Sequence, residues 1–268
     1  MRYILLFIAI FTFSCKYNIT SPVGTIKDYS ANSGKLFYTS SDDSDEDIKM
    51  TLMKNKHSLG KYLIKVSPTN DKSTAILTNI KAALDKNPSF DNVEIDLSLT
   101  KITNIPKEMF TNTTNLGKIT LPDTVTNIEE SAFSGCYSLN SIRFPNNLEN
   151  ISEGAFSNCS GLTLIILSSG ALTNISKNAF YGSSSLVNLI LPANISNVCD
   201  TAFSNCSQLN NVEYLGTNTN ISGSPFSNGS NPSNLYLPNV DTSKTNEFNT
   251  NCFLDKKDWK ITKGHIPS

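Results

Sequence analysis

The sequence predicts an α/β repeat solenoid, in which stacked coils share a parallel sheet on one face and a small α/β cap covers the N-terminal end. Three observations predict this fold. A phenylalanine recurs every 23 or 24 residues, several apolar columns keep the same period, and an alternating strand with an amphipathic helix precedes the repeat. Sequence periods of 20–50 residues are typical of stacked coils. The recurring phenylalanines are Phe110, Phe133, Phe156, Phe180, Phe203 and Phe226.

Other columns follow the same period. An aliphatic residue stands five positions before each phenylalanine, and an asparagine stands one position before that. Six residues after the phenylalanine comes a leucine, until Pro232 breaks the run. The asparagines are Asn104, Asn127, Asn150, Asn174, Asn197 and Asn220. We expect them to form hydrogen bonds in a corner between coils; the alternative is plain polar exposure.

Each unit contains a short predicted strand in the fragment Leu-x-x-Ile-x-Leu-Pro. Its apolar residues alternate with polar ones, which is the period of a strand with one buried face. One coil cannot close a core alone, so equivalent residues of neighbouring coils must stack into apolar ladders. Such strands pair in parallel about 4.8 Å apart. A proline usually follows and ends the strand, because it has no N–H to donate.

The repeat resembles a known family. The pattern C-x-x-L-x-x-I-x-L-P-x-x-V-x-x-I-x-x-x-A-F runs from Cys136 to Phe156 and returns with small drifts in neighbouring units. It is similar to the leucine-rich repeats of BspA-like bacterial surface proteins, over roughly residues 90–238. The motif is specific for the fold and much weaker for function. The resemblance implies a surface antigen or adhesin of a host-associated bacterium.

Composition narrows the function classes. The chain of 268 residues has 22 basic and 23 acidic residues, so no excess of positive charge indicates nucleic-acid binding. Asn, Ser, Thr and Ile dominate, which suits a β-rich exported protein with a neutral polar surface.

Residues 1–15 are predicted to be a lipoprotein-type signal peptide. Arg2 gives the positive start, and an apolar stretch of about ten residues follows, too short to span a bilayer. Cys15 is the expected lipidation site, after cleavage before it. Thr12 and Phe13 depart from the consensus that precedes a lipidated cysteine. The alternatives are an ordinary signal peptide cleaved nearby and an uncleaved anchor.

Residues 16–60 are predicted to be a flexible tether. They are rich in Ser, Thr, Asn and Gly and contain an acidic run from Asp42 to Asp47. Such a run repels itself and buries no apolar area, so we expect it to stay extended. Calcium binding is the alternative, but the spacing of a calcium-binding loop is absent.

Residues 61–97 are predicted to be the N-terminal cap. Tyr62, Ile64 and Val66 alternate as in a strand, and Ser73 or Thr74 could cap a helix that ends near residue 86. Its apolar face, with Ile76, Leu77, Ile80, Ala83 and Leu84, is expected to act as a lid. Residues 93–97 are then expected to form the first strand of the solenoid sheet.

The repeats occupy residues 98–238, and residues 239–268 are predicted to be a C-terminal cap. That cap carries spaced apolar residues, and Trp259 is expected to cover the last coil. Terminal units of a solenoid need such atypical caps.

The cysteines favour a structural role. Cys136, Cys159 and Cys206 share one column and predict a buried ladder of small residues. A disulfide between neighbouring coils, or between Cys199 and Cys206, is an open alternative. If Cys15 is lipidated, five cysteines remain, including Cys252, so at least one of them is unpaired. No pair of cysteines has zinc-finger spacing, and His57 and His265, expected to be plain surface residues, lie at opposite ends of the chain.

We predict no catalytic residues, no metal site and no cofactor, because none of the common nucleophile, phosphate-loop or dinucleotide motifs is present. The candidate ligand-binding site is instead the outward face of the sheet. Its middle is expected to be apolar, with polar residues on both sides. A slipped strand register, a covering loop or a neighbouring subunit would each remove this patch. The candidate residues are Lys118, Arg143, Leu164, Ile166, Asn188, Ile190, Asn211, Glu213 and Tyr236.

The sequence thus favours a surface-anchored protein that binds another protein, from host matrix or another cell surface, through its sheet face. It would be exported and held at the bacterial envelope by its N-terminal lipid. The alternative is a structural or antigenic envelope lipoprotein without a dedicated ligand.

Overall fold

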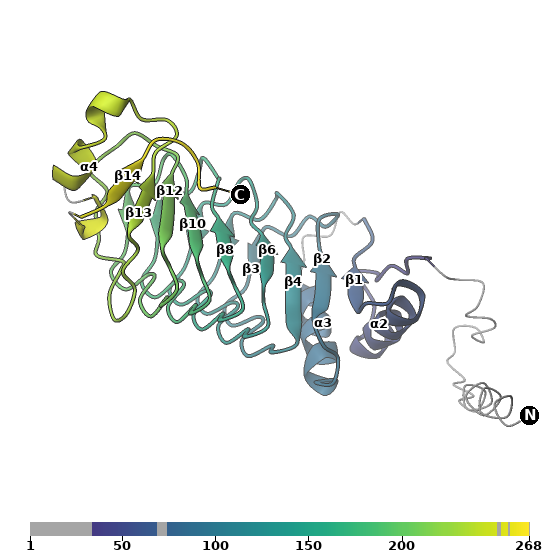
Figure 1. Ribbon diagram of the computed structural model, residues 1–268. Helices are drawn as coiled ribbons and strands as arrows, with labels where there is room; N and C mark the ends of the chain where they lie inside the picture. Colours follow the sequence, from purple (N-terminus) through teal and green to yellow (C-terminus); the bar gives the residue numbers. More distant parts are fainter. Residues whose placement is uncertain (1–33, 69–73, 251–252, 257, 268) are drawn as a thin grey trace, which may run out of the picture.

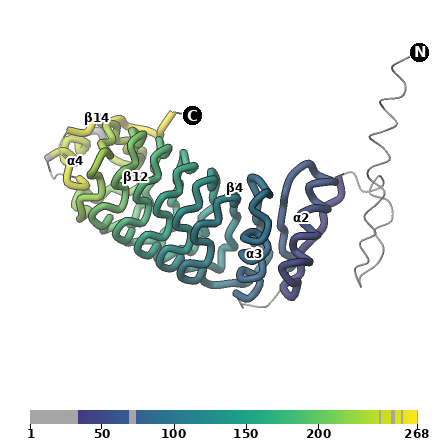
Figure 2. Tube along the Cα trace, turned by 90° about the horizontal axis from the view of Figure 1, so that it is seen from below, coloured from purple at the N-terminus to yellow at the C-terminus, as the bar shows by residue number. Residues whose placement is uncertain are grey.

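The computed structural model describes residues 34–68, 74–250, 253–256 and 258–267. The predicted signal peptide with Cys15, residues 16–33 of the predicted tether, Ser73 and Cys252 lie outside these residues. In the part that is described, the chain forms a row of coils that runs from helix α2 at one end to helix α4 at the other (Figures 1 and 2). No helix within these ranges is long and apolar enough to span a bilayer.

The front of the solenoid is formed by parallel strands, one from each coil. One sheet has the order β1-β2-β4-β6, and a second has the order β8-β10-β12-β13-β14. The first sheet comprises β1 (Leu63–Lys65), β2 (Val93–Asp96), β4 (Leu116–Thr120) and β6 (Ser141–Arg143). The second comprises β8 (Leu164–Ile166), β10 (Asn188–Leu191), β12 (Asn211–Tyr214), β13 (Asn234–Tyr236) and β14 (Lys260–Thr262). The predicted parallel solenoid and its front strands are confirmed, although β1 and not β2 is the first strand.

A second ladder, which the sequence did not predict, is made from the asparagine column. Its strands have two residues each: β3 (Asn104–Ile105), β5 (Asn127–Ile128), β7 (Asn150–Ile151), β9 (Asn174–Ile175) and β11 (Asn197–Val198). Four of the six asparagines bond between coils in pairs, as expected but within these strands, whereas Asn104 Nδ2 donates to Glu129. Asn150 Nδ2 donates to Asn127 Oδ1 over 2.7 Å, and Asn197 Nδ2 donates to Asn174 Oδ1 over 2.6 Å.

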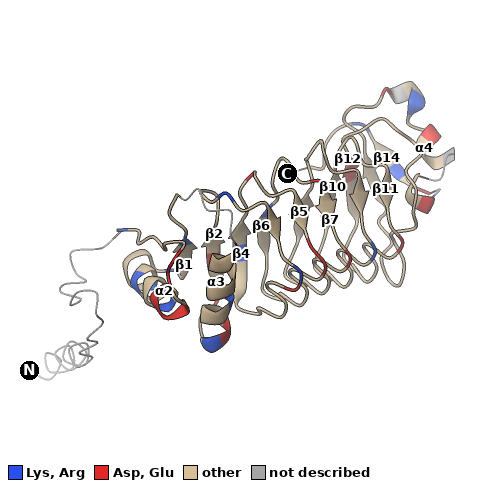
Figure 3. Ribbon diagram, turned by 180° about the vertical axis from the view of Figure 1, so that it is seen from behind, with Lys and Arg blue, Asp and Glu red and all other residues tan. Residues whose placement is uncertain are grey.

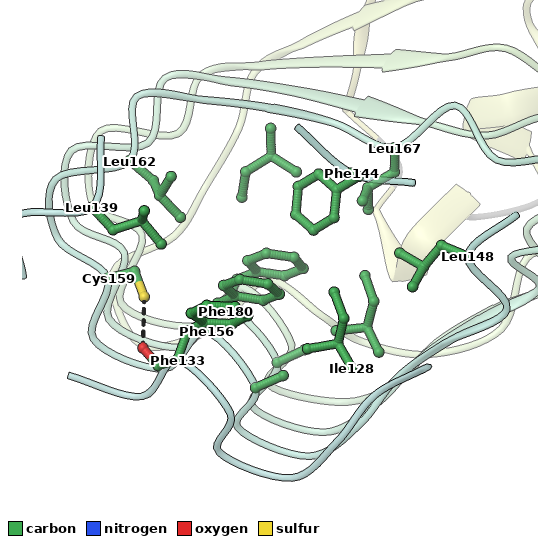
Figure 4. Close-up of a cluster of buried hydrophobic side chains, with 14 of the residues drawn as sticks. Ile128, Phe133, Leu139, Phe144, Leu148, Phe156, Cys159, Leu162, Leu167 and Phe180 are labelled. Atoms are coloured by element: carbon green, nitrogen blue, oxygen red, sulfur yellow. Dashed lines mark hydrogen bonds between the residues drawn. The ribbon is translucent and has the colours of Figure 1, made fainter. Parts of the chain in front are cut away.

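The core is built around the phenylalanine column. The five rings from Phe110 to Phe203 are fully buried, and neighbouring centroids lie 5.0–5.3 Å apart in near-parallel planes. Figure 4 shows Phe133, Phe156 and Phe180 stacked, with Leu139 and Leu162 on one side and Ile128 of the second ladder on the other. Aromatic rings at this separation attract one another in addition to the effect of their burial. The column breaks down at Phe226, which is tilted by 34° and only partly buried.

The cysteine column is a ladder of free, buried thiols, as predicted. Cys136, Cys159 and Cys206 each donate from Sγ to the backbone carbonyl of the phenylalanine in the preceding coil, at 3.1–3.3 Å. Figure 4 shows the bond from Cys159 to Phe133. Cys199 is also free, so it does not pair with Cys206. Burial raises the pKa of Cys136 and of Cys206 to about 12 and that of Cys159 well above its usual range.

These thiols are expected to be inert in the folded protein. An aromatic disulfide reagent at pH 8 should label Cys136, Cys159 and Cys206 only as fast as the chain unfolds, because the thiolate is the reactive form. In the unfolded chain their pKa is about 8.5, so unfolding releases protons above that pH and stability falls as pH rises. Mass spectrometry of labelled peptides, with and without urea, tests this. Rapid native labelling of any of the three would contradict the buried ladder.

The prediction of an extended tether is wrong for residues 34–60. Helix α2 (Asp45–Leu59) begins at Ser44, whose side chain and that of Asp47 each accept a hydrogen bond from the other's backbone N–H, and it ends at Gly60 with φ 76°. The acidic residues therefore occupy the first turn of a helix, where negative charge is favourable. Ile48 and Leu52 are fully buried, so this segment is part of the core.

Helix α2 covers the N-terminal end of the solenoid. The buried side chain of Asn55 accepts from Phe37 N and donates to the carbonyls of Phe37 and Leu63, at 2.7–2.9 Å. The predicted lid, α3 (Ala75–Lys86), instead packs between α2 and the repeats (Figure 2), with its predicted apolar face buried. Thr74 takes the capping position but makes no side-chain capping bond.

The far end is closed by irregular structure. It contains short helices η3 (Thr242–Lys244), α4 (Glu247–Thr250) and η4 (Phe253–Asp255), followed by β14. Trp259 is buried edge-on against Phe226, with centroids 6.0 Å apart, and its ring N–H donates to Phe253 O. The tryptophan therefore covers the last ring of the phenylalanine column.

Candidate functional site

The outward side chains of the front strands form two columns. Strand pairing sets the register within each sheet, and the repeat period continues each column from β6 to β8, which do not pair. One column passes through Lys118, Ser141, Leu164, Asn188, Asn211 and Asn234. The other passes through Thr120, Arg143, Ile166, Ile190, Glu213 and Tyr236. All nine predicted site residues lie in these columns. They share one face, but they are not equally accessible.

The middle of the face is apolar and exposed, as the sequence predicts. Leu164 and Ile166 are 43% and 47% exposed, and they flank the buried Ile165 on β8. Ile190, on the neighbouring strand, is half-buried. The strand register therefore does not slip at this run of four aliphatic residues, and Leu164 and Ile166 are exposed in this chain.

The strand ladder is interrupted beside this patch. Strands β6 and β8 do not pair, whereas the ladder of short strands continues through the same coils. Ile142 of β6 is only half-buried, while its column neighbours Ile119 and Ile165 are fully buried. Strands β6 and β8 thus lie in neighbouring coils without pairing, and the sheet is loosened next to the exposed patch.

On one side of the patch, Arg143 is held in place by the coil before it. Its Nη2 lies 3.2 Å from both carboxylate oxygens of Asp123, and its Nη1 donates to Leu121 O. The backbone N–H of Asn146 and then the Arg143 guanidinium hold the pKa of Asp123 below its usual range. Arg143 is therefore an oriented part of the rim, while Lys118 is exposed further along the sheet.

On the other side of the patch, three asparagines form a ladder across the strands. Asn211 Nδ2 donates to Asn188 Oδ1 over 2.7 Å, and Asn234 Nδ2 donates to Asn211 Oδ1 over 2.8 Å. All the bonds run in the same direction, so the ladder presents the Asn188 amide nitrogen toward β8. Within the described residues this nitrogen has no protein acceptor, which leaves a donor next to the apolar patch.

Glu213 does not belong to an open surface, contrary to the prediction. Its side chain is only 4% exposed, because His265 Nδ1 lies 2.5 Å from Oε1 and Ile266 N donates to Oε2 over 2.9 Å. His265, which we expected to be a plain surface residue, holds this contact. Tyr236 is half-buried beside it. The segment that follows β14 thus covers this end of the face.

Charge is sparse on the central coils. Figure 3 shows acidic and basic residues gathered on α2, on the end of α3 and at the far end near α4, with few over the coils between them. No group of three His, Cys, Asp or Glu residues in the described ranges is arranged to hold a metal ion. Two pockets, of about 310 and 420 Å³, lie at the far end among residues 217–258.

The sequence analysis missed two groups that shape the face. Asp123 orients Arg143 from a turn between coils, and a carboxylate twenty residues before an arginine gives no periodic signal. The segment with His265 and Ile266 lies outside the repeat, so its position cannot be predicted from the spacing of the repeat columns. Its only signal is the glycine before it, Gly264, which has φ +120°.

Comparisons with known proteins agree with this geometry. The family described as BspA type leucine rich repeat region matches residues 78–195 and 103–235, with six copies of the repeat. No curated protein matches the chain.

Solved structures of bacterial leucine-rich repeat proteins are similar to the chain. A leucine-rich repeat protein of T. pallidum is 22% identical over 63% of this chain and 85% of its own, with a TM-score of 0.44. A leucine rich cell surface protein from Faecalibacterium prausnitzii is 28% identical over 48% of this chain, with a TM-score of 0.46, and only 34% of that protein is covered. The pneumococcal vaccine antigen PcpA is 20% identical over 66% of this chain and 42% of its own, with a TM-score of 0.52, a likeness of fold.

The family match spans more than half of the chain, and its repeats coincide with the coils from α3 to β13. The chain belongs to the BspA-type leucine-rich repeat family.

Proposed function

We propose that the protein binds another protein through the middle of its front sheet face, as an adhesive protein at a bacterial surface. The observation that carries this proposal is the exposed pair Leu164 and Ile166 beside the interrupted strand ladder. Family membership supports a protein-binding role at the cell surface, since solenoid repeats form extended surfaces that bind other proteins.

The composition of the patch suits a protein partner. Protein interfaces combine a desolvated apolar centre with a polar rim that fixes orientation. Here the centre is Leu164, Ile166 and the exposed part of Ile190, and the rim is Arg143 with the donor end of the asparagine ladder at Asn188. The partner is expected to present aliphatic or aromatic side chains, with an acceptor opposite Asn188.

The location of the protein follows from the same proposal. Export through residues 1–15 and lipidation of Cys15 would hold the folded part close to the outer face of a membrane. The partner would then be a host matrix protein or a surface protein of another cell. A coat protein without a dedicated ligand is the alternative that the experiment must separate from this one.

A binding assay with a double variant tests the proposal. The chain from Lys16 onward and its Leu164→Asp/Ile166→Asp variant are titrated against immobilised host matrix and plasma proteins by surface plasmon resonance. We expect saturable binding by the unaltered protein and at least a tenfold loss in the variant, because two charges enter an apolar contact. Both side chains are exposed, so the melting temperature should change by only a few degrees.

A matched control removes apolar surface elsewhere. Leu99 and Tyr137 are also exposed, away from the front columns, and Leu99→Asp/Tyr137→Asp should keep full binding. Equal binding by all three proteins would move the site off the sheet face. No binding by the unaltered protein to any member of the panel would favour the coat protein.

A further inference from the structure

A buried carboxylate lies on the outward side of the sheet. Glu213 stands in the column of Ile190 and Tyr236, which are half-buried, yet its own side chain is 4% exposed. A carboxylate removed from water in this way requires hydrogen-bond donors of its own. Neither neighbour in the column supplies one.

The donors come from residues 263–267, which we call the cover segment. A carboxylate only accepts hydrogen bonds, so His265 Nδ1 donates to one oxygen, while the backbone N–H of Ile266 donates to the other. The chain reaches this position by a turn at Gly264, whose φ of +120° is a conformation that other residues rarely adopt. Figure 1 shows the chain turning back after β14 and running across β13 and β12 toward β10.

The cover segment does not extend the sheet. Strand pairing with β13 ends at Thr262, and the segment then crosses the strands instead of joining them. Its histidine side chain is 72% exposed, and Ile266 is half-buried. Segments that bury few apolar side chains open at low free-energy cost. The segment is therefore the part of the face that is most easily displaced.

The geometry of this contact is that of a bound peptide. A short extended segment gives one carboxylate a backbone N–H and a nitrogenous side chain. Ile190 and then Ile166 lie in register on the next two strands. With strands about 4.8 Å apart, Glu213 and Ile166 are separated by about 10 Å, a distance that three extended residues span. A peptide anchored on Glu213 and directed toward β8 therefore reaches the exposed apolar patch.

We propose that the cover segment is an intramolecular occupant of the binding face, displaced by an extended peptide of the partner protein. This inference rests on the proposed function and specifies its ligand. The peptide presents a basic or imidazole side chain and the next backbone N–H to Glu213. Its following aliphatic side chain lies on Ile190 and Ile166. The natural partner competes with the cover segment because it gains the Leu164 and Ile166 patch, which the segment leaves exposed.

The test uses a synthetic peptide with the sequence of residues 262–268 as the probe. Three forms of the chain from Lys16 are compared. The first is unaltered. The second is a release variant, His265→Ala/Ile266→Pro, which removes both donors to Glu213. The third adds Glu213→Gln to the release variant. Binding is measured from amide chemical-shift changes in NMR titrations.

The release variant should bind the peptide saturably, with shifts confined to β8, β10 and β12. The unaltered protein should bind at least about tenfold more weakly, because its own segment competes at a millimolar effective concentration. Adding Glu213→Gln should weaken binding about tenfold, since bonds to a charged acceptor are about twice as strong as neutral ones. Glu94→Gln in the release variant is the matched control, because Glu94 is an outward carboxylate on β2 paired with Lys61, and it should keep the affinity.

The outcomes separate this inference from the proposed function. A folded release variant that does not bind the peptide, or that binds it equally well with Glu213→Gln, would overturn the inference. A panel protein bound with equal affinity by the unaltered and release forms would also overturn it, while leaving the protein-binding function intact. If the proline disturbs folding, a chain that ends at Thr262 also lacks both donors to Glu213 and is scored in the same way.

Discussion

Replacing Phe156 by alanine is expected to lower the free energy of unfolding by about 3–5 kcal/mol. Its ring is fully buried between Phe133 and Phe180, at centroid separations of 5.0 and 5.2 Å, and Phe144 contacts it edge-on. The substitution opens a cavity in the middle of a continuous column. Neighbouring coils cannot collapse into it, because the ladder of short strands through β5, β7 and β9 fixes their spacing.

Urea denaturation followed by circular dichroism measures this effect. Tyr137→Ala is the control, since that aromatic side chain is 52% exposed and its loss should change stability by less than about 0.5 kcal/mol. Because the total stability of a domain is about 5–15 kcal/mol, the alanine variant could be unfolded, and Phe156→Leu then gives a measurable intermediate value. A loss below 1 kcal/mol for Phe156→Ala would mean that the column does not hold the coils together.

Replacing Leu52 by alanine is expected to cost about 2–5 kcal/mol in the N-terminal unit. Leu52 is fully buried on the face of α2 that packs against α3 and β1. A solenoid is stabilised by contacts between nearest neighbours, so the loss should appear first as opening of α2 and β1, with the central coils still folded.

Hydrogen exchange of the Ile64 and Val66 amides, measured together with urea denaturation, tests this expectation. Met53→Ala, on the exposed side of the same helix, is the control and should leave exchange unchanged. If Leu52→Ala exchanges no faster than the unaltered protein, residues 45–59 would behave as the extended tether that composition predicts, and α2 would not be an end cap.

The repeat shows how far a sequence can specify a fold. Residues at equivalent positions of a repeat stack on one another. The phenylalanine stack, the front strands and the cysteine ladder could therefore all be predicted from the sequence alone. The exposed Leu164 and Ile166 followed from the same register. The second ladder was missed because its two-residue strands are too short to show an alternating pattern.

Helix α2 shows where composition misleads. The acidic run from Asp42 to Asp47 resembles a solvated linker, but Ser44 and Asp47 form a capping box before a helix with buried residues at positions 48, 51, 52 and 55. The helical spacing was present in the sequence. It was outweighed by the charge of the first turn, which is favourable at a helix N-terminus and not a sign of extension.

The sequence by itself determined the family, the solenoid and the outward columns, because stacking places equivalent residues of adjacent repeats side by side. Only the tertiary structure decided which part of the outward face is open. The partners of Glu213 lie 52 and 53 residues away, outside the repeat. Contacts between a periodic segment and a non-periodic one depend on the path of the chain in space, and no spacing along the sequence encodes that path.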